Sequence, residues 1–193
     1  MDLLILIIGV VMGSGVNFND NTGPVHITNQ SRVLRASVIG KLIEIISNPV
    51  GGGQSLNRSA SNIDVKISFN DLKRNRWVAE LYKEDALLVD ESIKTLDSII
   101  LNGSVKLKRQ FRGYYNSALG LYGLYEKPFN IEVVRKNSDN IIDDVIRAAQ
   151  ETVSSCSNLD SEFLQEDIDN GIRMIVSYSI IECIVLENPN DYN

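Results

Sequence analysis

The sequence predicts a mainly α-helical fold, a bundle of about four to five helices with a short N-terminal β segment. Three observations support this prediction. Apolar residues recur at helical spacing over most of the chain beyond residue 31. Asparagine, glycine and proline interrupt that periodicity and mark the ends of helices. Only residues 1–30 combine a β-branched apolar run with a short alternating stretch, as strands do.

The N-terminal segment, residues 1–30, begins with an apolar run over residues 3–12. The run is about half as long as the roughly 20 residues that a membrane-spanning helix needs. Only Asp2 precedes it, whereas a signal peptide begins with positive charge. A buried strand or a remnant of the chain start is the favoured interpretation, and a membrane-associated peptide is the alternative.

A lead-in helix is expected over residues 31–47, with Ser31 as its N-cap. Its apolar residues share one helical face, at Leu34, Val38, Leu42, Ile45 and Ile46. A flexible linker rich in glycine, serine and asparagine follows over residues 48–61. The linker is the best internal boundary, and residues 62–193 are expected to form one helical domain.

Four helices are expected in that domain, after a strand-like phrase that begins at Asp64. The first is capped by Asn70 or Asp71 and has apolar residues at helical spacing as far as Ile99. Acidic residues open the third, where they suit the positive end of a helix dipole. The expected ranges are about 70–99, 104–122, 139–155 and 165–187. Asn102-Gly103 separates the first two helices, and turn signals at Lys127-Pro128 and Asn137-Ser138 separate the second from the third. The last helix is expected to end at Asn188-Pro189.

Composition narrows the class of protein. A hydrophobic content of 44% and a charged content of 23% are ordinary for a globular domain, so disorder throughout is not expected. The net charge of −6 argues against a whole-protein nucleic-acid binder. Cys156 and Cys183 stand in apolar helical settings, where cysteine is usually a small buried hydrophobe. This usage fits a reducing cytosol, and we expect a cytoplasmic protein, with membrane association through residues 3–12 as the alternative.

Charge is unevenly distributed along the chain. Acidic residues dominate after Ser138, whereas basic residues open the first long helix at Lys73, Arg74 and Arg76. A basic patch is predicted on the next helix, at Lys106, Lys108, Arg109 and Arg112. Either the two kinds of face attract each other across the bundle, or the patch binds a partner protein or a nucleic-acid backbone.

No catalytic or metal-binding pattern occurs in the sequence. His26 is the only histidine, and no cysteine or second histidine stands at ligand spacing from it. The glycines at residues 51–53 lack the lysine of a phosphate-binding loop. The carboxylates of Asp143-Asp144 and around Glu166 suit a divalent cation, but acids on solvated helix faces are commoner. We expect a chain that is not an enzyme and holds no cofactor.

Two phrases carry a resemblance to a known family. Residues 66–72, K-I-S-F-N-D-L, are similar to the K-I-x-[FY]-N-x-L opening of the C-terminal domain of ABC-three component system proteins. Residues 172–189 resemble the last helix of that domain, with Ile180 where the pattern has an aromatic. The matching positions are Ile175, Val176, Ile181, Cys183, Val185, Leu186 and Glu187. The resemblance covers about residues 31–190.

The resemblance implies a component of a bacterial conflict system. Such a domain is thought to couple an effector, such as a protease or nuclease, to an ABC ATPase and a small middle component. About 30 residues precede the recognisable region, too few for such an enzyme, and this favours a coupling role. We therefore expect a protein–protein interaction module in antiviral defence, with the ATPase and the middle component as partners. A homo-oligomer is also compatible with the sequence.

The partner surface is predicted at Phe69, Leu72, Trp77, Tyr178, Ile181 and Cys183. Trp77 is the best single anchor because tryptophan dominates binding hot spots, and plain core packing is its alternative role. Two other functions are compatible with the sequence. One is a membrane-perturbing effector that acts through residues 3–12, and the other is a nucleic-acid-binding regulator that uses the basic patch.

Overall fold

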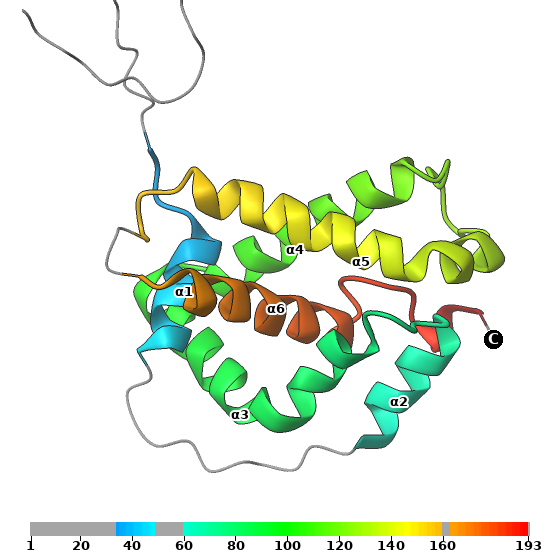
Figure 1. Ribbon diagram of the computed structural model, residues 1–193, viewed down its shortest axis with the longest axis horizontal. Helices are drawn as coiled ribbons and strands as arrows, with labels where there is room; N and C mark the ends of the chain where they lie inside the picture. Colours follow the sequence, from blue (N-terminus) through cyan, green and yellow to red (C-terminus); the bar gives the residue numbers. More distant parts are fainter. Residues whose placement is uncertain (1–33, 49–59, 160–162, 193) are drawn as a thin grey trace, which may run out of the picture. The chain divides into compact units, whose positions relative to one another are not determined.

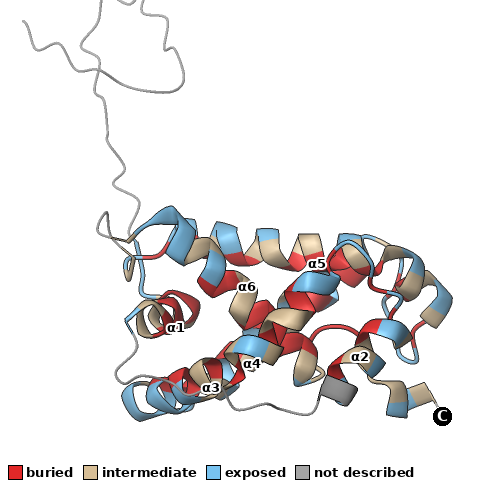
Figure 2. Cartoon of the chain, turned by 60° about the horizontal axis from the view of Figure 1, so that its bottom comes forward, coloured by how far each residue is buried: buried red, intermediate tan, exposed pale blue. Residues whose placement is uncertain are grey.

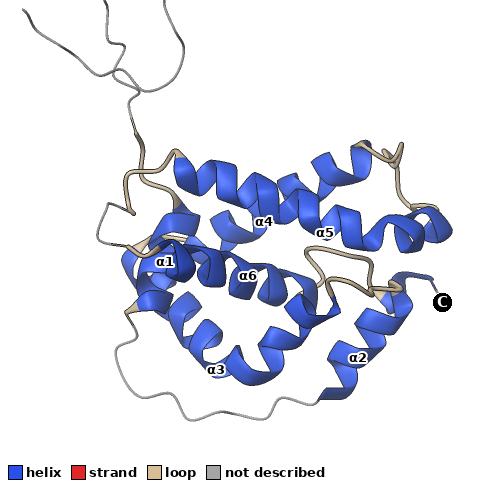
Figure 3. Cartoon of the chain, in the orientation of Figure 1, coloured by secondary structure: helices blue, strands red, loops and turns tan. Residues whose placement is uncertain are grey.

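The computed structural model describes residues 34–48, 60–159 and 163–192 (Figure 1). Within these residues the chain forms six α-helices and one short 3-10 helix, with no strand beyond a single bridge between Arg35 and Cys156 (Figure 3). The mainly helical class and the helical bundle are confirmed. The predicted β segment and the apolar run over residues 3–12 lie outside the described residues.

The described residues form six α-helices, one more than the four to five that the sequence predicts, and most of them are shorter than their predicted ranges. Their bounds are α1 Val38–Ser47, α2 Ala60–Phe69, α3 Arg76–Ile99, α4 Gly103–Gly120, α5 Ile131–Ser154 and α6 Gln165–Ile181, followed by the 3-10 helix Pro189–Tyr192. Among these helices, none has both the length and the apolar character that crossing a bilayer requires.

Helix α6 lies at the centre of the bundle. It packs most extensively along α3 and also contacts α1, α2, α4 and α5, while α4 packs along α5. Much of α6 is buried (Figure 2). Its apolar residues Ile172, Ile175 and Val176 are fully buried or nearly so. A helix that is covered on several sides must be apolar on several sides, and the sequence of α6 has this character.

The phrase that begins at Asp64 forms a helix, α2, and the predicted strand there is wrong. Ile63 and Ile67 are four residues apart and both buried, as one face of a helix requires. Asn70 does not cap the next helix because its side chain is bonded to Glu187. Helix α3 therefore begins only at Arg76.

Two other helix starts differ from the prediction. Helix α1 begins at Val38, because the hydroxyl of Ser37 accepts a 3.2 Å hydrogen bond from the N–H of Ile39. Helix α5 begins at Ile131 instead of 139, with the side chain of Asn130 accepting hydrogen bonds from the first turn. Polar residues that resemble turn signals thus lie inside α5, at Asn137 and Ser138.

Helix α6 ends at Ile181 and not at Glu187. Cys183 and Leu186 have positive φ angles, 55° and 66°, which a helix does not allow. The chain turns at these residues and returns Val185 to the core, where it is fully buried. The predicted last helix is therefore six residues too long, because its apolar run continues in a turn.

Candidate interaction surface

Three of the predicted partner residues contribute to packing within the protein. Leu72 is 4% exposed and Tyr178 is 6% exposed, so both belong to the core, and their predicted place on a partner surface is corrected. Phe69 is half-buried between Tyr192 and the guanidinium of Arg135, whose carbon is 4.8 Å from the ring centroid. Phe69 therefore links the end of α2 to the C-terminal 3-10 helix and to α5.

Trp77 is different, because 48% of it is exposed. It lies in the first turn of α3, and the guanidinium carbon of Arg173 on α6 lies 5.6 Å from its ring centroid. This is the distance of a cation–π contact, which holds both side chains against the surface. Core packing therefore does not describe Trp77, and the pair presents a broad aromatic and cationic surface to solvent.

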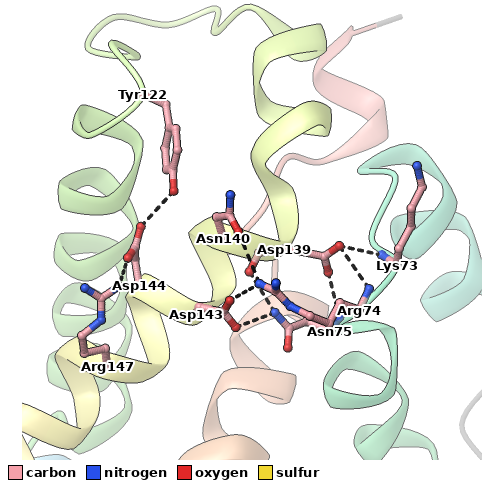
Figure 4. Close-up of polar contacts among 9 residues, drawn as sticks. All are labelled: Lys73, Arg74, Asn75, Tyr122, Asp139, Asn140, Asp143, Asp144 and Arg147. Carbon is pink, nitrogen blue, oxygen red and sulfur yellow. Dashed lines mark hydrogen bonds and ion pairs between the residues drawn. The ribbon is translucent and has the colours of Figure 1, made fainter.

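The turn that leads into α3 is held in place by α5 (Figure 4). The carboxylate of Asp139 accepts hydrogen bonds from the backbone N–H groups of Lys73, Arg74 and Asn75, at 3.3, 3.1 and 2.7 Å. The Asn75 side-chain amide in turn donates to the Asp139 carbonyl and to Asp143, both at 2.8 Å. Because unpaired N–H groups and positive charge gather at a helix start, a carboxylate there is stabilising.

This arrangement corrects the predicted role of Asp139. The sequence placed it in the first turn of its own helix, but α5 begins at Ile131, and Asp139 instead serves the start of α3. Arg74 also pairs with Asp143 across the two helices. The attraction predicted between basic and acidic faces is therefore found here, and it fixes the turn that immediately precedes the first turn of α3, where Trp77 lies.

A second cluster surrounds the end of α6. The ammonium of Lys66 on α2 donates to the carbonyl of Ile180 at 2.7 Å and to that of Ile181. A guanidinium nitrogen of Arg112 on α4 donates to the carbonyl of Cys183 at 3.0 Å. The last carbonyls of a helix have no partner within the helix, and cations are favourable at its negative end. Lys66 and Arg112 therefore cap the C-terminal end of α6 and the turn that follows it.

The predicted basic patch is divided between two roles. Lys108 pairs with Glu182 at 3.1 Å, and Arg112 binds the α6 end. Partial burial by itself would lower the pKa of Lys108, but the hydrogen bond with Glu182 and the interactions with Tyr178 and the Glu182 charge together outweigh it, so the pKa lies above its usual value. Lys106 and Arg109 are exposed, and neither has an ion pair within the described part of the chain.

Ile181 and Cys183, the remaining predicted partner residues, line an open hollow of about 420 Å³. Lys66 and Val65 of α2 also line it, and Val65 is 54% exposed. Sequence reasoning missed Lys66 as a site residue although it opens the family-like phrase. It also missed Arg173, because no local spacing links it to Trp77.

Across the described residues, no three histidine, cysteine, aspartate or glutamate side chains lie close enough to share a metal ion. His26 lies outside those residues. Comparisons with protein-family models, with curated proteins and with solved structures find no match to the chain. The resemblance to ABC-three component proteins stays a prediction.

Proposed function

We propose that the chain is a non-enzymatic interaction module of a bacterial ABC-three component defence system. In this proposal it couples an effector to the ABC ATPase and the middle component. The observation that supports a binding role is the half-exposed Trp77 stacked against Arg173. Tryptophan and arginine are the residue types that most often dominate the binding energy of protein interfaces.

The energetics of Trp77 favour a partner. A half-exposed tryptophan leaves roughly 100 Å² of mostly apolar surface in water, and covering it contributes about 2 kcal/mol to binding. The side chain is already fixed by Arg173 and by the anchored start of α3, so little conformational entropy is lost on binding. The pair thus has the properties of a preorganised anchor.

The charges around Trp77 indicate the chemistry of the partner surface. Lys73, Arg74 and Arg76 precede it. Their side chains are 74%, 61% and 53% exposed, and each also pairs with a carboxylate of this chain. A surface with an apolar pocket for the indole and an acidic rim would complement this arrangement. The acidic rim would act mainly on the rate and specificity of association.

Co-expression and co-purification with an ABC ATPase and a middle component of such a system test the proposal. The wild-type chain is expected to capture them, and Trp77→Ala is expected to weaken binding about tenfold or more, which corresponds to about 1.4 kcal/mol. Tyr125→Ala is the matched control, because Tyr125 is a 78% exposed aromatic on the loop after α4. If the folded wild-type chain captures neither the folded ATPase nor the folded middle component, the coupling role is overturned. Equal capture by wild type and Trp77→Ala overturns the assignment of the surface alone.

A further inference from the structure

The side chains of Lys66 and Cys183 meet beside the end of α6. The lysine Nζ lies 2.7 Å from the cysteine Sγ, although the two residues are 117 positions apart in the sequence. This separation is shorter than an ordinary contact between an amine and a thiol. The contact joins two nucleophilic atoms, although neither core packing nor the proposed partner surface depends on it.

Both atoms are held where they are by other contacts. The Lys66 nitrogen is oriented by the carbonyls of Ile180 and Ile181. Cys183 has a φ of 55°, a conformation that residues other than glycine rarely adopt. Its carbonyl is held by Arg112, and the next N–H, that of Ile184, donates to the carbonyl of Ser179 at 2.9 Å. Backbone strain of this kind persists only where surrounding contacts fix it, and it is concentrated at functional sites.

We propose that Lys66 and Cys183 form an oxidative crosslink in which one oxygen atom bridges the lysine nitrogen and the cysteine sulfur. An N–O bond and an O–S bond that meet at a bent oxygen hold nitrogen and sulfur at about the separation found here. The bridge therefore needs no movement of α2 relative to the end of α6. This inference is independent of the proposed partners.

The chemistry requires a peroxide as oxidant. In the first step, one hydrogen peroxide converts the Cys183 S–H to S–O–H and leaves as one water. Lys66 then gives its extra proton to solvent and reacts as the amine. In the second step, the N–O bond forms while nitrogen and the S–O–H oxygen each lose one hydrogen, and a second peroxide is reduced to two waters. The bridged nitrogen keeps one hydrogen, which one of the two α6 carbonyls still accepts.

Access of the oxidant distinguishes Cys183 from the other cysteine. Cys183 and Lys66 both line the open hollow at the end of α6, whereas Cys156 is buried at 6% exposure. A covalent bridge across 117 positions also restricts the unfolded chain, as a disulfide closing a long loop does. Crosslinking is therefore expected to raise the melting temperature.

The test uses the full chain, purified with reductant and then exposed to hydrogen peroxide. Intact mass spectrometry is expected to show a gain of one oxygen and a loss of two hydrogens, reversed by dithiothreitol. Protease digestion is expected to recover the peptides that contain Lys66 and Cys183 as one joined species. Lys66→Arg, which keeps the positive charge, and Cys183→Ser are expected to lose this product. Lys73→Arg, which replaces an exposed lysine close to Lys66 in the sequence, is expected to keep the crosslinked product.

Three results would overturn the inference. One is a gain of oxygen without loss of hydrogen, which is a plain sulfenic acid. Another is a loss of two hydrogens alone, from a direct sulfur–nitrogen bond or a disulfide. The third is the expected mass change with no joined peptide. Since the peptide map is made on the wild-type chain, the inference is testable even if Lys66→Arg fails to fold.

Discussion

The phenol hydroxyl of Tyr115 donates a 2.9 Å hydrogen bond to the carboxylate of Glu187, and both side chains are buried. Tyr192 donates to the other carboxylate oxygen at 3.0 Å. The side-chain amide of Asn70 exchanges two hydrogen bonds with the backbone of Glu187, each 3.0 Å long. Glu187 therefore joins α2, α4 and the C-terminal 3-10 helix, and it holds the segment that follows α6 against the core.

Removing the Glu187 carboxylate is expected to destabilise the fold strongly. Glu187→Ala leaves the buried hydroxyl of Tyr115 and the partly buried hydroxyl of Tyr192 without this acceptor, and a fully buried unpaired polar group costs about 1–3 kcal/mol. We expect the free energy of unfolding to fall by about 3 kcal/mol, measured by urea denaturation. Glu187→Gln keeps one acceptor oxygen and is expected to lose about 1 kcal/mol.

The matched control for this prediction is Glu84→Ala, which removes an exposed carboxylate from α3. Surface substitutions of this kind usually change stability by less than about 0.5 kcal/mol. If Glu187→Ala and Glu84→Ala lower the urea midpoint equally, the buried network is not a source of stability.

Alkaline pH is expected to weaken the fold through the same residues. Burial, followed by the charge of Glu187, raises the pKa of Tyr115, and burial with the Glu187 hydrogen bond raises the pKa of Tyr192. A pKa that is higher in the folded chain stabilises it at pH values below the unfolded value of about 10, and this contribution is lost as pH rises further. We expect the free energy of unfolding to fall above about pH 10, by about 1.4 kcal/mol per pH unit for Tyr115 and by less for Tyr192, which is partly exposed and screened by solvent.

Tyr115→Phe provides the contrast for the pH series. It removes the group with the larger shift, so the decline of stability above about pH 10 is expected to become shallower, even though the variant is less stable at neutral pH. A decline that is equally steep in Tyr115→Phe and in wild type would contradict the assignment to this tyrosine.

The sequence predicts helix boundaries well where the signal is local. The end of α3 near Ile99 follows from the Asn102-Gly103 break, and the start of α6 at Gln165 follows from its periodicity. Boundaries set by distant contacts were missed. Asn137 and Ser138 resemble a turn, but their side chains bond to the carbonyls of Val133 and Asp71, and the helix continues through them.

In the candidate site, too, residues marked by a local signal were predicted and residues brought in by distant contacts were not. Composition and residue type were enough to select Trp77, and the family-like pattern was enough to select Cys183. Their partners, Arg173 and Lys66, lie on other helices and become neighbours only when α6 packs against α3 and α2. The spacing of residues within one helix does not predict which residues of another helix it will contact, so such pairs cannot be predicted from sequence patterns alone.

The role of Asp139 at the start of α3 is testable with the single tryptophan of the chain. Asp139→Ala removes the acceptor of three backbone N–H groups, and loss of a helix cap costs about 0.5–2 kcal/mol. We expect lower stability and red-shifted Trp77 emission, because the first turn of α3 loosens. Glu91→Ala, in the exposed middle of α3, is the control. An unchanged emission spectrum in Asp139→Ala would show that α5 does not hold this turn.

The same substitution at two glycines is expected to have opposite effects on stability. At Gly113, in α4, an added Cβ meets nothing within 4 Å, so Gly113→Ala gains helix propensity and about 0.5–1 kcal/mol. At Gly40, in α1, the Cβ would lie 2.9 Å from the Sγ of Cys156 and 3.1 Å from the Cβ of Asn158. Overpacking of this kind typically costs about 1–3 kcal/mol, which exceeds the propensity gain. Urea denaturation should therefore place the midpoint of Gly113→Ala above wild type and that of Gly40→Ala below it. A stabilised Gly40→Ala would mean that the segment around Cys156 is free to move away from α1.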